Sequence, residues 1–191
     1  MIIVLLGASG SGKSTIENEL IKYHGFKKII PYTTRKPRGY EFDGSDYFFI
    51  NNKTFHEMIK SGLFAEYNKY PQERWYGTLI SDYSEGNKIV VLTPNGLRQI
   101  KKTCQNNDIF TVFVDSNLGT RIKRYINRCG VDRFSFDDKN EIANRTERDY
   151  GMFAGVEDEV DLVIHNNEET NIIDLVNEIF NKYKALRGCL N

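Results

Sequence analysis

Near its start the chain reads Gly7-Ala8-Ser9-Gly10-Ser11-Gly12-Lys13-Ser14, which matches the phosphate-loop pattern G-x-x-x-x-G-K-[ST]. The apolar residues 1–6 before it predict a buried strand, and residues 13–23 predict a helix. Glycines let backbone N–H groups close around phosphate oxygens, and the helix N-terminus adds positive potential. A lysine in this position reaches terminal phosphates, and the Ser14 hydroxyl can bind accompanying magnesium. A plain Gly/Ser turn is the alternative, but the flanking elements favour a nucleoside triphosphate site.

Composition restricts the class of protein. The chain has 191 residues, enough for one compact unit with a buried core, and its 26 Lys and Arg balance its 26 Asp and Glu. This net charge of zero gives no basic field for a nucleic-acid partner. Three scattered cysteines without a C-x-x-C pair predict a reduced, cytoplasmic protein. No stretch is apolar over the length of a membrane span, and the N-terminal run lacks a basic leader, so no membrane partner is expected.

Alternating strand and helix patterns predict an α/β fold of the P-loop NTPase type. Further core strands are expected at 26–32, 88–93, 109–115 and 160–165, and further core helices at 94–103, 117–128, 136–150 and 169–183. Strands separated by helices imply a parallel sheet with helices on both faces. Residues 33–83 break this rhythm. Short strands at 47–50, 64–67 and 75–76, with helices at 54–61 and 79–85, predict an inserted, mostly antiparallel α+β lobe there.

This inserted lobe begins with a stretch dense in anion-binding groups: Thr33-Thr34-Arg35-Lys36-Pro37-Arg38-Gly39-Tyr40-Glu41-Phe42-Asp43-Gly44-Ser45-Asp46-Tyr47-Phe48-Phe49. Arg35 and Arg38 lie three residues apart, and Pro37 restricts the backbone between them. Guanidinium groups suit bidentate phosphate binding. Most charged loops are only solvated, so these residues alone do not decide between a phosphate site and a solvated basic turn.

The same stretch resembles the signature of guanylate kinases, T-T-R-x-P-R-x-x-E-x-x-G-x-x-Y-x-F. Glu66 followed by Tyr76-Gly77-Thr78 resembles that family's second nucleotide-pocket block, and residues 7–14 resemble its phosphate loop. Weaker likeness continues through Asn95-Gly96, residues 121–148 and residues 160–166, so it covers nearly the whole chain in the family's order. Three ordered blocks are far more specific than any single block.

The resemblance implies a Mg²⁺-dependent nucleoside monophosphate kinase of purine nucleotide metabolism, which converts ATP and GMP (or dGMP) to ADP and the diphosphate. It implies a single domain, a monomer or homodimer, in three parts: a core (1–32, 84–125 and 158–191), a monophosphate-binding lobe (33–83) and a mobile lid (126–157). The implied ATP-binding residues are Gly7, Ala8, Ser9, Gly10, Ser11, Gly12, Lys13, Ser14 and Thr15, with Ser14 as the metal ligand. The implied GMP-binding residues are Arg35, Arg38, Tyr47, Glu66, Tyr76, Gly77 and Thr78.

The implied catalytic residues are Lys13, Arg35, Arg128 and Arg145. Phosphoryl transfer requires positive charge around the moving group and little else from the protein. Arg124 and Arg128 share a face of one predicted helix, and Arg145 and Arg148 lie on the next. By family position, Arg128 and Arg145 would close over the phosphates, with Arg124 as a candidate third.

The expected role of Glu66 in reading the base also has a physical reason. Guanine presents N1–H and its 2-amino group side by side, and one carboxylate can accept both donors. Adenine presents an acceptor at N1, which a carboxylate repels. A site that pairs buried polar groups rejects analogues that leave them unpaired, by factors of ~10⁴ in good cases. Without the resemblance, the spacing of Glu66 favours an ordinary exposed strand carboxylate.

Several positions depart from the family's pattern. The family has a serine pair where this chain has Pro31 and Tyr32, and one of those serines contacts the base edge. It has aspartates at the positions of Val91 and Thr93, one of which organises the lysine, the magnesium or the monophosphate. Asp115, at the end of the next predicted strand, is the candidate substitute for this missing acid.

These departures leave three hypotheses open. The chain is an active guanylate kinase, a kinase for a different or modified nucleoside monophosphate, or a non-catalytic guanylate-kinase-like module that binds a phosphorylated partner. Such modules typically have eroded phosphate loops, so the intact Gly12-Lys13-Ser14 argues against the third hypothesis.

Overall fold

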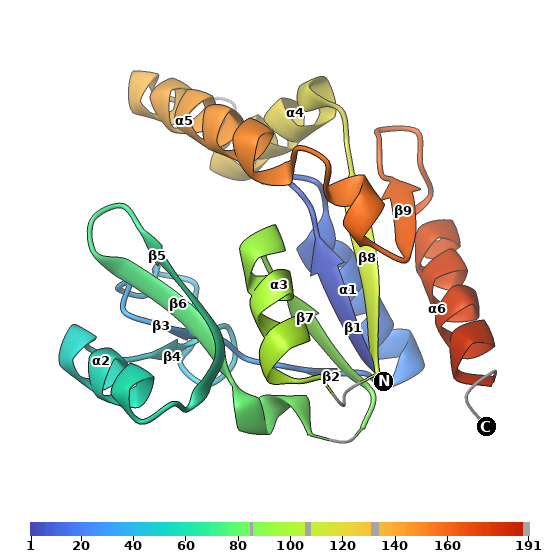
Figure 1. The fold of residues 1–191 in the computed structure, drawn as a ribbon. Coiled ribbons are helices and arrows are strands. Elements are labelled where there is room, and N and C mark those ends of the chain that lie inside the picture. Colours follow the sequence, from blue (N-terminus) through green and yellow to red (C-terminus); the bar gives the residue numbers. More distant parts are fainter. Residues whose placement is uncertain (85, 106–107, 131–133, 189–191) are drawn as a thin grey trace.

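A five-stranded parallel sheet forms the core of the computed structural model, which describes residues 1–84, 86–105, 108–130 and 134–188 (Figure 1). In spatial order its strands are β2 (Lys27–Lys28), β7 (Lys88–Val91), β1 (Ile2–Leu6), β8 (Ile109–Asp115) and β9 (Leu162–His165). Every residue of β1 is buried, which explains its unbroken apolar sequence. The predicted α/β class with a parallel sheet is confirmed.

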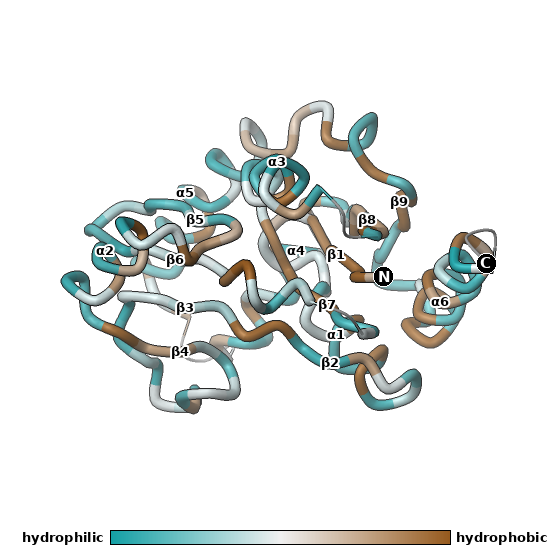
Figure 2. The backbone as a smooth tube through the Cα atoms, turned by 60° about the horizontal axis from the view of Figure 1, so that its bottom comes forward, coloured by the Kyte–Doolittle hydropathy of each residue, from teal (hydrophilic) through white to brown (hydrophobic). Residues whose placement is uncertain are grey.

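Helices cover both faces of this sheet, as predicted. Side chains alternate along β1, so Ile3 and Leu5 pack on one face while Val4 and Leu6 pack on the other. The first face is covered by α1 (Lys13–His24) and α6 (Ile172–Gly188), and the second by α3 (Pro94–Thr103). Figure 2 shows that hydrophobic residues are concentrated in these central strands, whereas the residues of the outer loops are largely hydrophilic.

A second, four-stranded sheet lies beside the core. Its strands, in order, are β4 (Phe48–Phe49), β3 (Tyr32–Thr33), β6 (Arg74–Leu79) and β5 (Phe64–Tyr70), with α2 (Asn52–Lys60) and a 3₁₀ turn (Ile80–Tyr83) in the same interval. The β3–β6 and β5–β6 pairs are antiparallel and the β3–β4 pair is parallel. The interval is therefore mostly antiparallel, as expected. The helix predicted at 79–85 is only the 3₁₀ turn, and residue 85 lies outside the described residues.

The single strand predicted at 26–32 is wrong, because the chain changes sheets within that range. The N–H of Ile29 donates to Ile89 O at 2.9 Å in the core sheet. Two residues later, Pro31 O accepts from Phe48 N at 2.9 Å in the second sheet. Proline has no N–H to continue the first ladder, so β2 ends before it and β3 begins after it.

Two helices, α4 (Leu118–Cys129) and α5 (Phe136–Phe153), cross over the end of the core sheet that carries the phosphate loop, and a 3₁₀ turn (Val156–Glu159) leads into β9 (Figure 1). Asn117 caps α4 and Ser135 caps α5, each accepting an N–H from three residues further on. No helix in the described ranges is long and apolar enough to span a bilayer. The division into core, lobe and mobile lid stays a prediction, and residues 131–133 of the expected lid and 189–191 of the expected core lie outside the described ranges.

Candidate active site

The phosphate-loop residues form the turn between β1 and α1. In an open parallel sheet, ligands bind beyond the carboxyl ends of the strands, at the place where the helices that follow neighbouring strands pass to opposite faces of the sheet. Strand β1, between β7 and β8, lies at such a place. Gly7, Gly10 and Gly12 all have positive φ, at 150°, 80° and 98°. A Cβ on Gly12 would come within 2.2 Å of Asn166 Nδ2, so only glycine fits there.

Lys13 and Asp149 meet at this loop, although they are far apart in the sequence. Lys13 Nζ donates to the carbonyl oxygens of Gly7 at 2.7 Å and Ala8 at 2.9 Å. Burial lowers the pKa of Lys13 to about 8, and the nearby Asp149 charge opposes this shift. Asp149, on α5, is only 4% exposed, and its Oδ2 accepts the N–H of Ser9 at 2.6 Å. A carboxylate therefore holds one of the donors that the motif assigns to phosphate.

Two further predictions concern this loop, the metal ligand Ser14 and the substitute acid Asp115. Ser14 is exposed in the first turn of α1, and its hydroxyl oxygen is the hard ligand that Mg²⁺ prefers. The described residues contain no cluster of three or more His, Cys, Asp or Glu that could hold a metal. Asp115 Oδ2 lies 3.1 Å from His165 Nδ1, so its carboxylate faces β9. The acids that act on the Lys13 charge are Asp149 and Glu17, so the substitution by Asp115 is not supported.

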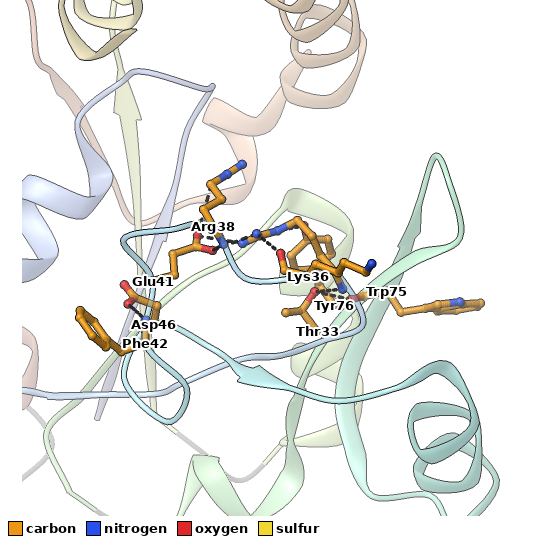
Figure 3. Close-up of polar contacts among 9 residues, drawn as sticks. Thr33, Lys36, Arg38, Glu41, Phe42, Asp46, Trp75 and Tyr76 are labelled. Atoms are coloured by element: carbon orange, nitrogen blue, oxygen red, sulfur yellow. Dashed lines mark hydrogen bonds and ion pairs between the residues drawn. The ribbon is translucent and has the colours of Figure 1, made fainter.

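The lobe brings together the residues expected to hold a monophosphate. Arg35 makes a two-pronged ion pair with Glu41, at 2.9 and 2.8 Å, and its Nε donates to Tyr76 Oη at 3.0 Å. The Arg35 guanidinium also lies 5.4 Å from the centre of the Tyr47 ring. Figure 3 shows Arg38 reaching the same carboxylate, through its backbone N–H at 2.8 Å and Nη1 at 3.3 Å. Four predicted GMP-binding residues therefore form one cluster around Glu41.

Glu41 is a site residue that the sequence interpretation passed over. Burial raises its pKa, but hydrogen bonds from Arg35 and Arg38 outweigh that effect, so the net shift is downward. Glu41 thus stays ionised and neutralises one of two guanidinium charges, which leaves one positive charge for an anion. The sequence signal that could have identified Glu41 is its position three residues after Arg38, within the guanylate kinase signature quoted above.

Glu66 is buried, contrary to the exposed strand carboxylate favoured without the resemblance. It is 5% exposed, and its Oε1 accepts from the Thr78 hydroxyl at 3.0 Å. Its Oε2 accepts from Asn68 Nδ2 at 2.9 Å. Burial raises the pKa of Glu66 to about 7, although both hydrogen bonds oppose the rise. Gly77, on the adjacent strand, is packed tightly, since a Cβ there would lie 2.7 Å from Glu66 O.

The two predicted lid arginines both lie near the ring of Tyr125. The guanidinium carbons of Arg128 and Arg145 lie 5.3 and 5.5 Å from the centre of the Tyr125 ring. Arg145 also pairs with Glu141 at 2.6 Å. A hollow between α4, α5 and the loop is lined by Ser9, Leu118, Arg121, Ile122, Tyr125, Ile142, Arg145 and Thr146. Arg145 is thus placed beside the loop, whereas Arg128 is exposed and does not line this hollow.

Arg121 and Arg124 lie closer to the phosphate loop than Arg128. Arg124 Nη1 donates to Gly10 O at 3.2 Å, and its Nη2 donates to Asn166 Oδ1 at 3.0 Å. Arg121 Nη1 lies 3.8 Å from the Asp149 carboxylate, and within the described part of the chain its buried Nε has no hydrogen-bond partner. Arg121 was not among the predicted site residues. Its spacing of three and seven from Arg124 and Arg128 places all three on one helix face, and that signal was available.

Helix α5 connects the loop to the lobe through two adjacent residues. Asp149 binds the loop at Ser9, and the Arg148 guanidinium lies 5.9 Å from the centre of the Tyr70 ring on β5. Arg148 Nη2 also donates to Asp149 Oδ1 at 3.2 Å. Helix α5 therefore contacts both the phosphate loop and strand β5 of the lobe.

A phosphate loop on a parallel sheet, beside a lobe with clustered arginines and a buried carboxylate, defines a P-loop nucleoside monophosphate kinase. The family model for guanylate kinase matches residues 1–183, and the chain belongs to the guanylate kinase family.

Two relatives agree with this membership, and a solved structure shares the fold. The chain is 30% identical over 199 residues to a guanylate kinase from Clostridioides difficile, an alignment that covers 96% of each chain. It is 29% identical over 186 residues to a guanylate kinase from Lactobacillus johnsonii, covering 94% of this chain and 87% of that one. The crystal structure of guanylate kinase from Anaplasma phagocytophilum has the same fold, with a TM-score of 0.72 at 18% identity, covering 97% of this chain and 85% of that one.

Proposed function

We propose that this protein transfers the γ-phosphoryl group of ATP to GMP or dGMP, giving ADP and the corresponding diphosphate. Membership of the guanylate kinase family supports the reaction class. The observation that carries the choice of base is the buried Glu66 carboxylate, flanked by hydrogen-bonding side chains on both of its oxygens. An ionised carboxylate in a dry site accepts the adjacent N1–H and 2-amino donors of guanine and repels N1 of adenine.

On the donor side, the loop from Gly7 to Thr15 binds the ATP phosphates in this proposal. Lys13 supplies a positive charge that moves from the loop carbonyls to the terminal phosphates. Bound Mg²⁺ would neutralise phosphate charge, and it would be held by the Ser14 hydroxyl together with nucleotide oxygens and water. The exposed position of Ser14 and the lack of a metal cluster among the described residues fit a cation that arrives with the nucleotide.

On the acceptor side, Arg35 and Arg38 hold the GMP phosphate, helped by the hydroxyls of Tyr47 and Tyr76. Arg145, with Arg121 and Arg124, supplies positive charge around the group in transfer, and Arg128 joins them when the lid closes. Closure excludes water, so that ATP is not lost to hydrolysis. A monomer or homodimer in the cytoplasm, without nucleic-acid or membrane partners, stays part of the prediction.

A coupled ADP-release assay with ATP and a panel of GMP, dGMP, IMP, AMP, CMP, UMP and dTMP tests the proposal. GMP and dGMP are expected to give the highest kcat/KM. Strong activity with a different base would instead support a kinase for another monophosphate. Silence across the panel, with ATP still bound, would contradict any kinase function and favour the binding-module hypothesis.

The pH profile of GMP phosphorylation is expected to have an acid limb that follows Glu66. Burial raises the pKa of Glu66 to about 7, so lowering the pH through 7 protonates the carboxylate that must accept the guanine donors. We expect kcat/KM for GMP to fall about tenfold per pH unit on that limb. Glu66→Gln serves as the control, because it removes the titration of Glu66 and keeps every other titrating group, including the GMP phosphate, Glu17 and Lys13. Superimposable wild-type and Glu66→Gln profiles would contradict this assignment.

Removing the Asp149 carboxylate is expected to tighten ATP binding. Asp149 Oδ2 lies 2.6 Å from Ser9 N and accepts its hydrogen. A phosphate oxygen that binds the same N–H must displace this carboxylate, because two negative groups cannot share one donor. Asp149→Asn keeps the shape and removes the charge, so ATP affinity should rise about tenfold by calorimetry. Asp137→Asn, at the exposed start of the same helix, should leave affinity unchanged. Weaker ATP binding in Asp149→Asn would refute the competition.

A further inference from the structure

A chain of side-chain hydrogen bonds joins the Glu66 carboxylate to helix α3. Asn68 lies two residues beyond Glu66 on β5, so both side chains point to the same face of the sheet. Asn68 Nδ2 donates to Glu66 Oε2 at 2.9 Å, and Asn68 Oδ1 accepts from Asn95 Nδ2 at 2.5 Å. Asn95 belongs to the first turn of α3, so the Asn68 amide is fixed between two elements of the fold.

The two partners also determine which end of the Asn68 amide faces which neighbour. The opposite orientation would press a carbonyl oxygen against the Glu66 carboxylate, and both groups are acceptors. A carbonyl oxygen has two lone pairs, and within the described ranges the only group that donates to Asn68 Oδ1 is Asn95. Asn68 is half-buried, and its Oδ1 can therefore accept one more hydrogen bond.

The two sides of Glu66 differ in hydrogen-bond character. Beside Oε1, the Thr78 hydroxyl lies 2.8 Å from the Tyr83 hydroxyl, and burial raises the pKa of Tyr83, so that hydroxyl stays protonated. The single Thr78 hydrogen lies on Oε1 in this structure, so Tyr83 donates to the Thr78 oxygen. When the N1–H of guanine occupies Oε1, the Thr78 hydrogen can turn to O6 of the base. Oε1 then faces N1–H, and Oε2 faces one hydrogen of the 2-amino group. The second hydrogen of that group points toward Asn68.

The separation of the two acceptors agrees with this order. An amino nitrogen that donates two hydrogen bonds of about 2.9 Å at its natural angle needs acceptors about 5 Å apart. Glu66 Oε2 lies 2.9 Å from Asn68 Nδ2. Within the Asn68 amide, Nδ2 and Oδ1 are ~2.3 Å apart, so Oδ1 lies up to about 5 Å from Oε2. Asn68 Oδ1 can therefore reach the required distance from Oε2.

We propose, building on the base-reading role of Glu66 in the proposed function, that Asn68 is a specificity-determining residue. Its Oδ1 accepts the second hydrogen of the guanine 2-amino group, and Asn95 holds the amide in the accepting orientation. IMP has the same O6 and N1–H but no 2-amino group. Asn68 therefore adds to the discrimination between GMP and IMP, whereas Oε1 of Glu66 and the Thr78 hydroxyl serve both substrates.

The test compares kcat/KM for GMP and IMP in the wild type, Asn68→Ala and Asn68→Leu. Leucine keeps the size of the side chain if alanine destabilises the hairpin, and thermal melting checks the fold of each variant. We expect both variants to lose about tenfold on GMP and less than about twofold on IMP. Gln99→Ala is the matched control. Gln99 also joins α3 to β5, through hydrogen bonds of 3.1 Å to the Tyr67 backbone, and within the described ranges it does not hydrogen-bond to Glu66.

Equal losses on GMP and IMP would overturn the proposal, because an Asn68 that only positions Glu66, or that contacts O6, would affect both substrates. Variants that keep wild-type kcat/KM on both GMP and IMP, and so leave the ratio of the two unchanged, would overturn the proposal as well. A wild-type protein that phosphorylates neither substrate would contradict the proposed function itself. An active wild type with unselective Asn68 variants would contradict only the role of Asn68.

Discussion

Replacing Lys13 with alanine is expected to lower kcat for GMP phosphorylation by about three orders of magnitude. In the structure the ammonium group lies on the carbonyl oxygens of Gly7 and Ala8, within the turn that would hold the terminal phosphates. Among the described residues Lys13 is the lysine that binds the loop carbonyls, and Arg124 reaches the loop at Gly10 O, so alanine removes the positive charge that lies beside Gly7 and Ala8. The measurement is single-turnover phosphoryl transfer at saturating ATP and GMP.

The fold should survive this change, because Lys13 contacts the loop and not the apolar core. Lys22→Ala is the control, since Lys22 is an exposed residue in the last turn of the same helix. Its turnover should match the wild type. Because the pKa of Lys13 is lowered to about 8, kcat/KM for ATP should also fall as the pH rises through 8. Undiminished turnover in a folded Lys13→Ala variant would refute the ATP-binding role.

Replacing Glu66 with alanine is expected to lower kcat/KM for GMP by ~10³ or more, with little effect on the slow reaction of AMP. Alanine removes the acceptor of two guanine donors and leaves them buried without partners. It removes nothing that adenine uses, because adenine has an acceptor at N1. The ratio of kcat/KM for GMP and AMP therefore measures the role of Glu66 separately from any general loss of activity.

Glu73→Ala is the matched control for Glu66. Glu73 is an exposed carboxylate in the turn of the same β5–β6 hairpin, where it pairs with Lys69 at 2.7 Å. This variant should keep the wild-type ratio of GMP to AMP. If Glu66→Ala lost GMP and AMP activity in equal proportion, Glu66 would be a structural residue and the base would be read elsewhere.

Much of the core was predictable because its signals are local. An apolar run followed by a glycine-rich turn and Lys13-Ser14 specifies a strand, a loop and a helix within a few residues. Helix α3 and strand β8 have the predicted bounds, since Pro94 marks the first turn of α3 and a run rich in β-branched and aromatic residues marks β8. The order of strands and helices along the chain then implies a parallel sheet.

The unpredicted features depend on contacts between distant residues. Whether residues 26–32 form one strand was decided by which sheet receives the Ile29 N–H and the Pro31 carbonyl. The Asp149 contact with Ser9 joins residues 140 positions apart, and no local pattern indicates it. The burial of Glu66 likewise depends on the packing of β6 and α3 against β5. The predicted site residues themselves stay predictions until substitution tests them.

The most direct test of the central claim follows the phosphoryl group itself. The protein is incubated with GMP, magnesium and ATP labelled in the γ-phosphoryl group, and the nucleotides are separated by anion-exchange chromatography. We predict that the label appears in GDP, with one ADP formed for each GDP, and that Lys13→Ala forms both products about a thousandfold more slowly. Label that remains in ATP, or that appears only in inorganic phosphate, would contradict the assignment of this chain as an ATP:GMP phosphotransferase.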